Sequence, residues 1–288
     1  SRPEEYDQWL KLAGAVTLPV TRFADAELRQ LPLKVGVGVG SDGTRHHASS
    51  LWTLADARAE AITRADESGV AQLESADAKC SFFSLTGPEQ ITVESGRILR
   101  RSRVNAAGVW ESSAAAVAVA LTAAAATHRA ILKAAAEHLL LKNVASPTGV
   151  VLAAADTSPA ERFLADVSQD AQTLTYISLG AVAVPGENPV HVVVAFAHRE
   201  GALLWHVGAA ETQKAAAILA ATEVLAAWQF AGDVEATLSM RTWDGLDPRA
   251  LVGDRPETGV EEVTFFAASI QAPMLSAAGI FAAAAVVA

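Results

Sequence analysis

The sequence predicts a large α/β (α+β) domain built from repeated units of sheet and alanine-rich helix. Runs of β-branched residues alternate along the chain with alanine-rich segments of helical periodicity. Three of these segments share one order, in which a glycine-containing extended stretch precedes an alanine-rich stretch with an embedded glutamate. Of the 288 residues, 51% are apolar and 19% are charged, which suffices for a sizeable core and differs from the composition of a disordered chain.

The three repeated units lie far apart in the sequence. Their extended stretches are residues 35–43, 104–108 and 203–214. The helices that follow are predicted at residues 54–68, 128–143 and 215–229. The embedded glutamates are Glu60, Glu137 and Glu223. Their spacing is too long and too uneven for a solenoid, so we expect one α/β unit used three times.

Further strands are predicted from β-branched and wholly apolar runs. They lie at residues 33–40, 88–95, 149–155, 173–185, 189–198 and 260–266. A Ser cap followed by Pro and Glu at 156–161 predicts a further helix start. No linker rich in Pro, Ser or Gly divides the chain, so we expect an N-terminal adapter at residues 1–30 and one domain at residues 31–288.

Composition excludes several classes of function. The net charge of −10 repels phosphate backbones, which makes nucleic acid an unsuitable partner. The single cysteine, Cys80, permits neither an internal disulfide nor a cysteine-built zinc site, and favours a reducing, cytoplasmic setting. The acidic start at Ser1 has no apolar signal core and is interpreted either as an artificial start or as the stub of a longer protein.

Two uncharged stretches, residues 112–127 and 264–288, could in principle be membrane-spanning helices. The first is mostly alanine, which is barely apolar. The second is interrupted by Pro273 and by polar residues, whereas a spanning helix needs about 20 consecutive apolar residues. We therefore expect no membrane span, and two buried strands around a turn at 264–288.

The three glutamates are the first candidates for chemistry. Carboxylates that converge from three helices repel one another unless a cation lies among them, and oxygen ligands suit Mg²⁺ and hence a nucleotide phosphate. The alternative is three ordinary glutamates on solvent-facing helix surfaces. The glycines of residues 35–43 offer either a phosphate-binding loop or a strand with close neighbours. The histidines match no HExxH pattern and no GxSxG elbow is present, which favours structural histidines.

The order and spacing of these segments resemble YcaO-domain proteins, which are ATP-dependent enzymes that modify peptide backbones. The first family signature, Ser-x-x-x-Glu-x-x-Glu-Arg, is matched by Asp56, Glu60, Thr63 and Arg64. The resemblance covers most of residues 30–288.

The other signatures are matched in part. The second signature is an Asn-Gly-x-Ala-x-Gly segment before a helix with Glu-x-x-Glu-Arg, and here Glu137 is followed by Leu140 and Leu141. The third places Glu-x-x-Gln on a helix, and here Glu223 is followed by Ala226. The segments matched outside the helices are residues 105–108, 208–210 and 259–287.

The resemblance implies a site for ATP and Mg²⁺. Glu60, Arg64, Glu137 and Glu223 would contact the nucleotide, and the three glutamates would bind the metal. In such enzymes a Cys, Ser or Thr side chain of a precursor peptide attacks the preceding amide, and ATP activates the oxygen that leaves. The second polar residue of each signature is missing here, which leaves the metal site short of ligands. The resemblance assigns no catalytic residue.

These departures favour a degenerate, non-hydrolysing YcaO-like partner in an azoline-forming complex of ribosomal peptide natural product biosynthesis. The alternative is an active cyclodehydratase that acts on Cys, Ser or Thr of a precursor peptide. A third, remote alternative is an unrelated alanine-rich enzyme that acts on small molecules. Because the apolar content is high and the uncharged runs are long, we expect an oligomer, formed with a second copy or with a catalytic or leader-binding protein.

Overall fold

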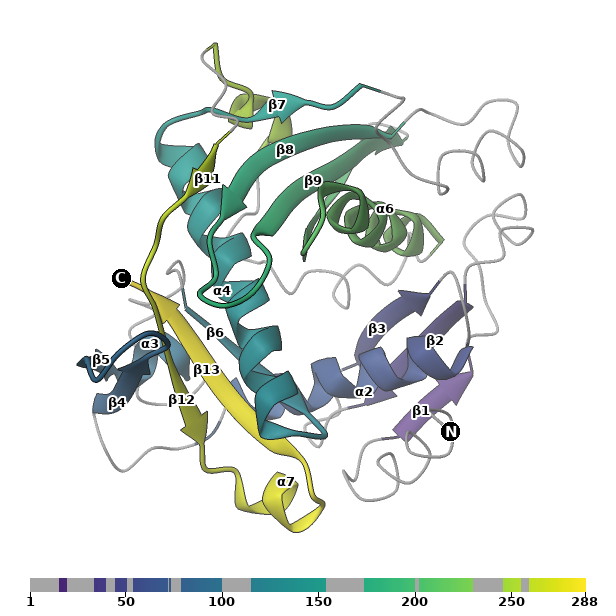
Figure 1. The fold of residues 1–288 in the computed structure, drawn as a ribbon. Helices are drawn as coiled ribbons and strands as arrows, with labels where there is room; N and C mark the ends of the chain where they lie inside the picture. Colours follow the sequence, from purple (N-terminus) through teal and green to yellow (C-terminus); the bar gives the residue numbers. More distant parts are fainter. Residues whose placement is uncertain are drawn as a thin grey trace.

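In the described residues the fold consists of three sheets with helices packed between and around them (Figure 1). This computed structural model describes residues 16–19, 34–39, 45–50, 54–71, 73, 79–99, 115–153, 174–199, 202–229, 246–254 and 259–288. The fold confirms the α/β (α+β) prediction, and most of its strand pairs are antiparallel.

The first sheet is antiparallel and has the order β1-β2-β3. Its strands are Val16–Pro19, Lys34–Val39 and Arg45–Ser50. The helix α2, Leu54–Ala71, packs against β2 and β3. Ala57, Ala61 and Ala65 recur every fourth residue along α2 and are all buried, because small side chains let a helix lie close to a sheet. The strand β1 comes from within the segment predicted as an adapter and pairs with β2.

The second sheet has the order β10-β9-β8-β11, and β7 also pairs with β8. Its strands β7 to β11 are Val150–Val151, Thr175–Val182, Val190–Arg199, Ala202–Ala210 and Val260–Glu261. The helix α6, Gln213–Gln229, packs against β10 and β9. Val192 and Val194 of β9 lie in the core cluster formed with the helix α4, Ala123–Ala145. Val193 and Ala195, on the opposite face of the strand, are also fully buried. The sheet is therefore covered on both faces.

The third sheet has the order β5-β4-β12-β13-β6. Its strands β4, β5, β6, β12 and β13 are Lys79–Ser84, Gln90–Glu94, Ala115–Ala120, Phe265–Ile270 and Phe281–Val287. Short helices, α3 (Ser95–Ile98) and α7 (Pro273–Ala277), follow β5 and β12. The two strands predicted at 264–288 are confirmed as β12 and β13, with α7 as the turn. In the described ranges, no helix has the length and apolar character that a bilayer crossing needs.

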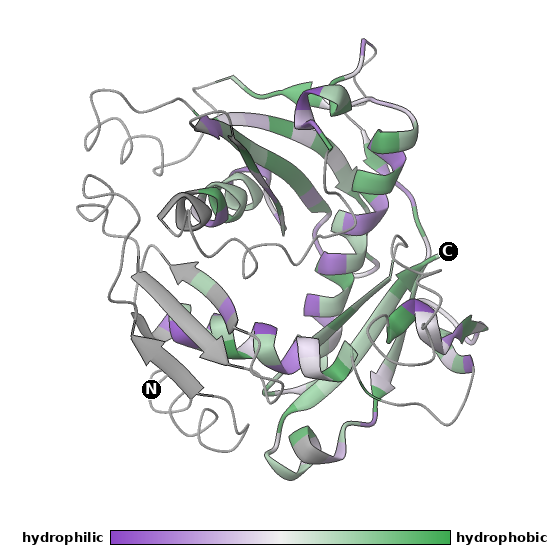
Figure 2. Cartoon of the chain, turned by 180° about the vertical axis from the view of Figure 1, so that it is seen from behind, coloured by the Kyte–Doolittle hydropathy of each residue, from purple (hydrophilic) through white to green (hydrophobic). Residues whose placement is uncertain are grey.

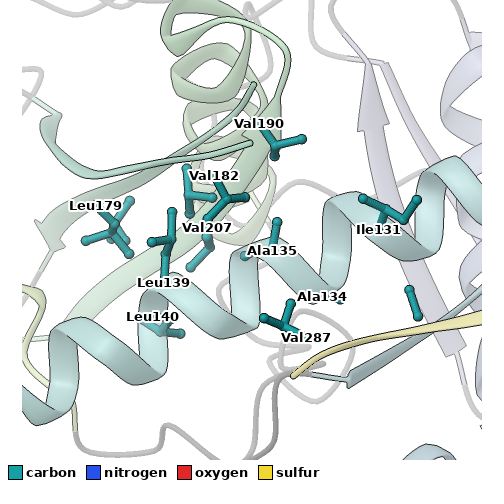
Figure 3. Close-up of a cluster of buried hydrophobic side chains, with 14 of the residues drawn as sticks. Ile131, Ala134, Ala135, Leu139, Leu140, Leu179, Val182, Val190, Val207 and Val287 are labelled. Carbon is teal, nitrogen blue, oxygen red and sulfur yellow. The ribbon is translucent and has the colours of Figure 1, made fainter. Parts of the chain in front are cut away.

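The helix α4, Ala123–Ala145, lies at the centre of the fold between the second and third sheets. Figure 3 shows Leu139 of α4 beside Val182 and Val207 of the second sheet, with Val287 of β13 on the other side of the helix. Figure 2 shows hydrophobic residues along most of β13, whereas hydrophilic and hydrophobic residues alternate along α2 and α4. The polar residues of these two helices form the site described below.

Several sequence predictions differ from the structure in extent. A strand precedes each of α2, α4 and α6, as the repeated unit predicts, although for α4 this strand is β6. In the predicted strand at 149–155, Val150–Val151 form β7, Gly149 makes an isolated parallel bridge to Val252, and residues 154–155 lie outside the described residues. The predicted strand at 260–266 is divided between β11 and β12. The glycine-containing strand β2 pairs on both edges, with β1 and β3, as the strand interpretation predicts. The predicted segments at 104–108 and 156–161 lie outside the described residues.

Candidate functional site

Six charged residues from α2, α4 and α6 meet in one group, which we call the three-helix ion-pair network. Its members are Glu60, Arg64 and Glu67 of α2, Arg129 and Lys133 of α4, and Glu223 of α6. The spacing on α2 and on α4 is three or four residues, which puts the charges of each helix on one face. The network thus contains three carboxylates and three cations.

Arg64 joins α2 to α6. Its two terminal nitrogens donate to the two carboxylate oxygens of Glu223, Nη1 to Oε2 at 2.9 Å and Nη2 to Oε1 at 2.8 Å. Its Nε donates to Oε1 of Glu60 at 3.2 Å, one helical turn earlier. This two-point geometry is the strongest form of arginine–carboxylate pairing.

Arg129 joins α4 to α2. Its Nη1 and Nη2 donate to Oε2 and Oε1 of Glu60 at 2.9 and 2.6 Å, and its Nε donates to Oε1 of Glu67 at 2.7 Å. Lys133 donates to the other oxygen of Glu67. The backbone N–H of Val119, on β6, also donates to Glu67 at 3.4 Å. All four oxygens of Glu60 and Glu67 are therefore engaged by cations.

The opposite charges of the network stabilise one another in their ionised forms. Burial acts to raise the pKa of Glu60, but the positive charges of Arg129 and Arg64 outweigh it and lower the pKa to about 2. Burial also opposes ionisation of Glu223 and Glu67, whose pKa values are nevertheless lowered by Arg64 and by Arg129 respectively. The pKa of Arg129 is raised, because Glu60 and Glu67 outweigh the effect of burial. The three carboxylates are consequently charged throughout the neutral range.

The structure brings together three of the four predicted site residues. Glu60, Arg64 and Glu223 are in direct contact through Arg64. The helix α4 contributes Arg129 to their hydrogen bonds, while Glu137 lies half-buried about two turns further along α4. The predicted nucleotide and metal roles of Glu60, Arg64, Glu137 and Glu223 stay predictions.

Sequence analysis missed Arg129, Lys133 and Glu67. Their signal was present, because Arg129 and Lys133 are four residues apart on a helix that is otherwise rich in alanine and leucine. Glu67 lies seven residues after Glu60 on the same helix and hence on the same face. Cations on one predicted helix and carboxylates on another predict an ion-pair contact once the two helices are known to be neighbours.

The residues that depart from the YcaO signatures are Thr63 on α2, Leu140 on α4 and Ala226 on α6. Thr63 donates its hydroxyl to the backbone oxygen of Ala59 at 2.8 Å, one turn back on α2. Leu140 is fully buried in the core between the sheets. Ala226 lies within α6. None of these residues supplies an oxygen ligand to the network.

The network does not fit a magnesium–triphosphate site as it stands. Each oxygen of Glu60 and Glu223 accepts a hydrogen bond from a guanidinium group, so a Mg²⁺ ion that used the remaining lone pairs would lie close to that positive charge and be repelled by it. Within the ranges that the structure describes, no three His, Cys, Asp or Glu side chains are grouped so that they could hold a metal ion.

His206 of β10 lies close enough to the network for Glu223 and Arg64 to influence its pKa. Its Nδ1 and the backbone oxygen of Val207 are 2.9 Å apart, so Nδ1 carries the proton and donates it. Burial lowers the pKa of His206, while Glu223 acts to raise it and Arg64 acts to lower it. The ring is therefore neutral at neutral pH, in agreement with a structural histidine.

Fold and site together define a mixed α/β protein in which helices packed on three sheets meet in one partly buried group of charges. Solved structures with a similar fold include a YcaO protein and a heterocyclase. One is "the structure of YcaO from Methanopyrus kandleri bound with AMPPCP and Mg2+", with a TM-score of 0.61, 13% identity, and coverage of 98% of this chain and 89% of that chain.

The other is a "heterocyclase in complex with substrate and cofactor", with a TM-score of 0.59 and 12% identity over 100% of this chain and 52% of that chain. The chain thus spans about half the length of that heterocyclase. At the level of sequence, no protein-family model and no curated protein matches it. The chain has the fold of YcaO proteins, as the resemblance of its helices predicts.

Proposed function

We propose that this chain is a YcaO-like component of an azoline-forming, peptide-modifying complex of ribosomal peptide natural product biosynthesis. In this proposal it does not hydrolyse ATP, and it binds the precursor peptide or scaffolds a catalytic or leader-binding protein in the cytoplasm. One observation carries the proposal: guanidinium groups of Arg64 and Arg129 occupy the carboxylates of Glu223 and Glu60.

The charge balance supports this proposal. Three cations already neutralise the three carboxylates of the network. The positive charges of Arg64 and Arg129 repel a Mg²⁺ ion unless an arginine leaves its carboxylate, and that arginine would then lose two charge-assisted hydrogen bonds in a partly buried place. A triphosphate alone would add negative charge to carboxylates that are already ionised. The lost signature residues offer no replacement ligand.

An active ATP-dependent cyclodehydratase is the second candidate. The retained Glu60, Glu137 and Glu223 favour it, as does the likeness to a YcaO protein that is bound to AMPPCP and Mg²⁺. In that reading Arg64 and Arg129 would release the carboxylates when the nucleotide arrives, and Arg64 would turn to the phosphates.

Calorimetry separates the two candidates. The full chain is titrated with AMPPCP in the presence of Mg²⁺, and we expect no binding below about millimolar concentration, the range of weak association. A micromolar dissociation constant would overturn the proposal and favour the enzyme.

A matched pair of variants tests the cause. Arg129→Gln frees one face of Glu60 and should increase the binding of Mn²⁺, used as a paramagnetic substitute for Mg²⁺. The control Arg249→Gln removes an exposed arginine that pairs with Asp247, outside the network, and should not change Mn²⁺ binding. Equal Mn²⁺ binding by both variants would show that Arg129 does not block the carboxylate.

The partner part of the proposal has its own test. The uncharged run that motivates an oligomer is explained partly by the core, since β13 lies inside the third sheet and is mostly buried. Exposed apolar side chains, such as Phe83 of β4 and Phe281 at the start of β13, leave surface for a partner. Light scattering and co-purification with proteins of the same pathway decide this. A monomer at tens of micromolar that retains none of them would refute an oligomer.

A further inference from the structure

One carboxylic acid of α2 lies on its apolar side, away from the ion-pair network. Ala59, Ile62 and Val70 of α2 are buried in a cluster with side chains of β6, β13 and the segment around α7. Asp66 lies four residues after Ile62 and four before Val70, which puts it in the same stripe of the helix. Its exposed fraction is 8%.

The three elements whose side chains share the cluster with this stripe, β6, β13 and α7, offer Asp66 no cation. The segments β6, β13 and α7 contain no titratable residue. The first sheet packs on α2 as well, and its strands carry Lys34, Arg45, His46 and His47. On α2 itself the neighbouring charge is the carboxylate of Glu67, which is of like sign.

The side chain is also short of hydrogen bonds. Oδ2 of Asp66 is buried, and within the described part of the chain it has no hydrogen-bond partner. An ionised carboxylate in such a place loses its hydration without compensation, whereas the neutral acid loses much less.

We propose that Asp66 is a proton-controlled anchor for α2. With its proton, Asp66 lets α2 pack on β6, β13 and α7. When it ionises, the charge is driven toward water and this contact loosens. Glu67, the next residue, and Glu60 and Arg64 on the same helix belong to the ion-pair network. Loosening α2 therefore also loosens the network, which makes the site sensitive to pH. This inference is independent of the proposed function.

The sign of the effect is opposite to that of an ordinary aspartate. Burial raises the pKa of Asp66 to about 7, with the charge of Glu67 as a second cause, from an ordinary value of 3.8. Between these two values the unfolded chain has lost the proton while the folded chain retains it. Stability from this group is thus largest at low pH, falls as the pH rises toward 7, and levels off above it.

Urea unfolding of the full chain at pH 5.5, 7.0 and 8.5 tests the proposal. The comparison is between the natural chain and Asp66→Leu, with Asp254→Asn, an exposed aspartate, as the control. Relative to Asp66→Leu, the unfolding constant of the natural chain should rise about 30-fold from pH 5.5 to 8.5, mostly below pH 7. Asp254→Asn should follow the natural chain.

Histidines titrate in the same range but do not disturb this comparison. Burial lowers the pKa values of His191 and His206, so their contribution increases stability as the pH rises through this range, and it is present in every variant. Parallel pH profiles of the natural chain and Asp66→Leu would overturn the proposal.

A direct measurement keeps the proposal testable if Asp66→Leu does not fold. The ¹³C shift of the Asp66 carboxyl, assigned with Asp66→Asn, should titrate near pH 7 in the natural chain, and amide exchange of α2 should quicken above that pH beyond the intrinsic increase. A carboxyl titration complete below pH 5, or an α2 exchange rate that follows only the intrinsic increase, would contradict it.

Discussion

Removal of Arg129 is the most informative single change, because this residue holds two carboxylates at once. In Arg129→Met the side chain keeps much of its length and apolar stem but loses three charge-assisted hydrogen bonds, two to Glu60 and one to Glu67. Glu60 keeps its contact with Arg64, and Glu67 keeps Lys133. The variant therefore weakens the network, while each of the two carboxylates retains one cationic partner.

The expected cost follows from burial and from the pKa of Glu60. Breaking a buried ion pair by removing one partner costs about 3–5 kcal/mol. The side chains of Arg129 and Glu60 are 26% and 30% exposed, which favours the low end of that range. The shift in the pKa of Glu60, from 4.5 to about 2, corresponds to about 3 kcal/mol before solvent screening and is shared among Arg129, Arg64 and Lys133. Because each carboxylate retains one cationic partner, we expect Arg129→Met to lower the free energy of unfolding by about 2 kcal/mol.

Urea unfolding followed by circular dichroism measures this loss. Arg249→Met is the matched control, because Arg249 pairs with Asp247 at the surface with 63% of its side chain exposed, and its free energy of unfolding should stay close to that of the natural chain. The double variant with Glu60→Gln should cost less than the sum of the single variants by at least about 1.5 kcal/mol. Equal losses for Arg129→Met and Arg249→Met would refute the reasoning, since the network would then be as well hydrated as the surface.

Three further predictions concern packing, pH and capping. Gly208→Ala should destabilise the chain by more than about 2 kcal/mol, since the added Cβ would lie 2.1 Å from the backbone oxygen of Ala216 on α6. Gly69→Ala on α2, where an added Cβ meets nothing within 4 Å, should instead stabilise it slightly, and thermal unfolding would show opposite shifts if the reasoning holds. Because the folded pKa of Glu60 is lowered, its stabilisation should be complete above pH 4.5 and disappear toward pH 2; an acid titration in which Glu60→Gln and the natural chain unfold identically would contradict this. Thr122→Ala should cost about 1 kcal/mol, because the hydroxyl of Thr122 accepts from the N–H of Ala125 at the start of α4; a helix that melts unchanged would argue against a capping role.

Local sequence determined the elements well. Alanine-rich segments with helical periodicity became α2, α4 and α6, and β-branched runs became β2, β8 and β9, because these preferences act within one or two turns of the chain. Boundaries were less certain: α4 begins at Ala123, because Thr122 caps it, and the prediction began at residue 128.

The candidate site was predictable only in part. Glu60, Arg64 and Glu223 could be singled out, because each lies on a predicted helix within a family-like motif. Their connection could not, since Arg64 and Glu223 are 159 residues apart and Arg129 and Glu60 are 69 residues apart. Which cation meets which carboxylate depends on how three sheets pack around α4.

The sequence by itself thus determined that three glutamate-bearing helices follow strands and carry reduced YcaO signatures. Tertiary structure decided what surrounds those glutamates, because helix packing brought Arg129 and Lys133 to Glu60 and Glu67 and buried Asp66. The physical reason is that a charge acquires its partners, and hence its pKa and its chemistry, from residues distant in the chain that only burial in a common core brings within a few ångströms.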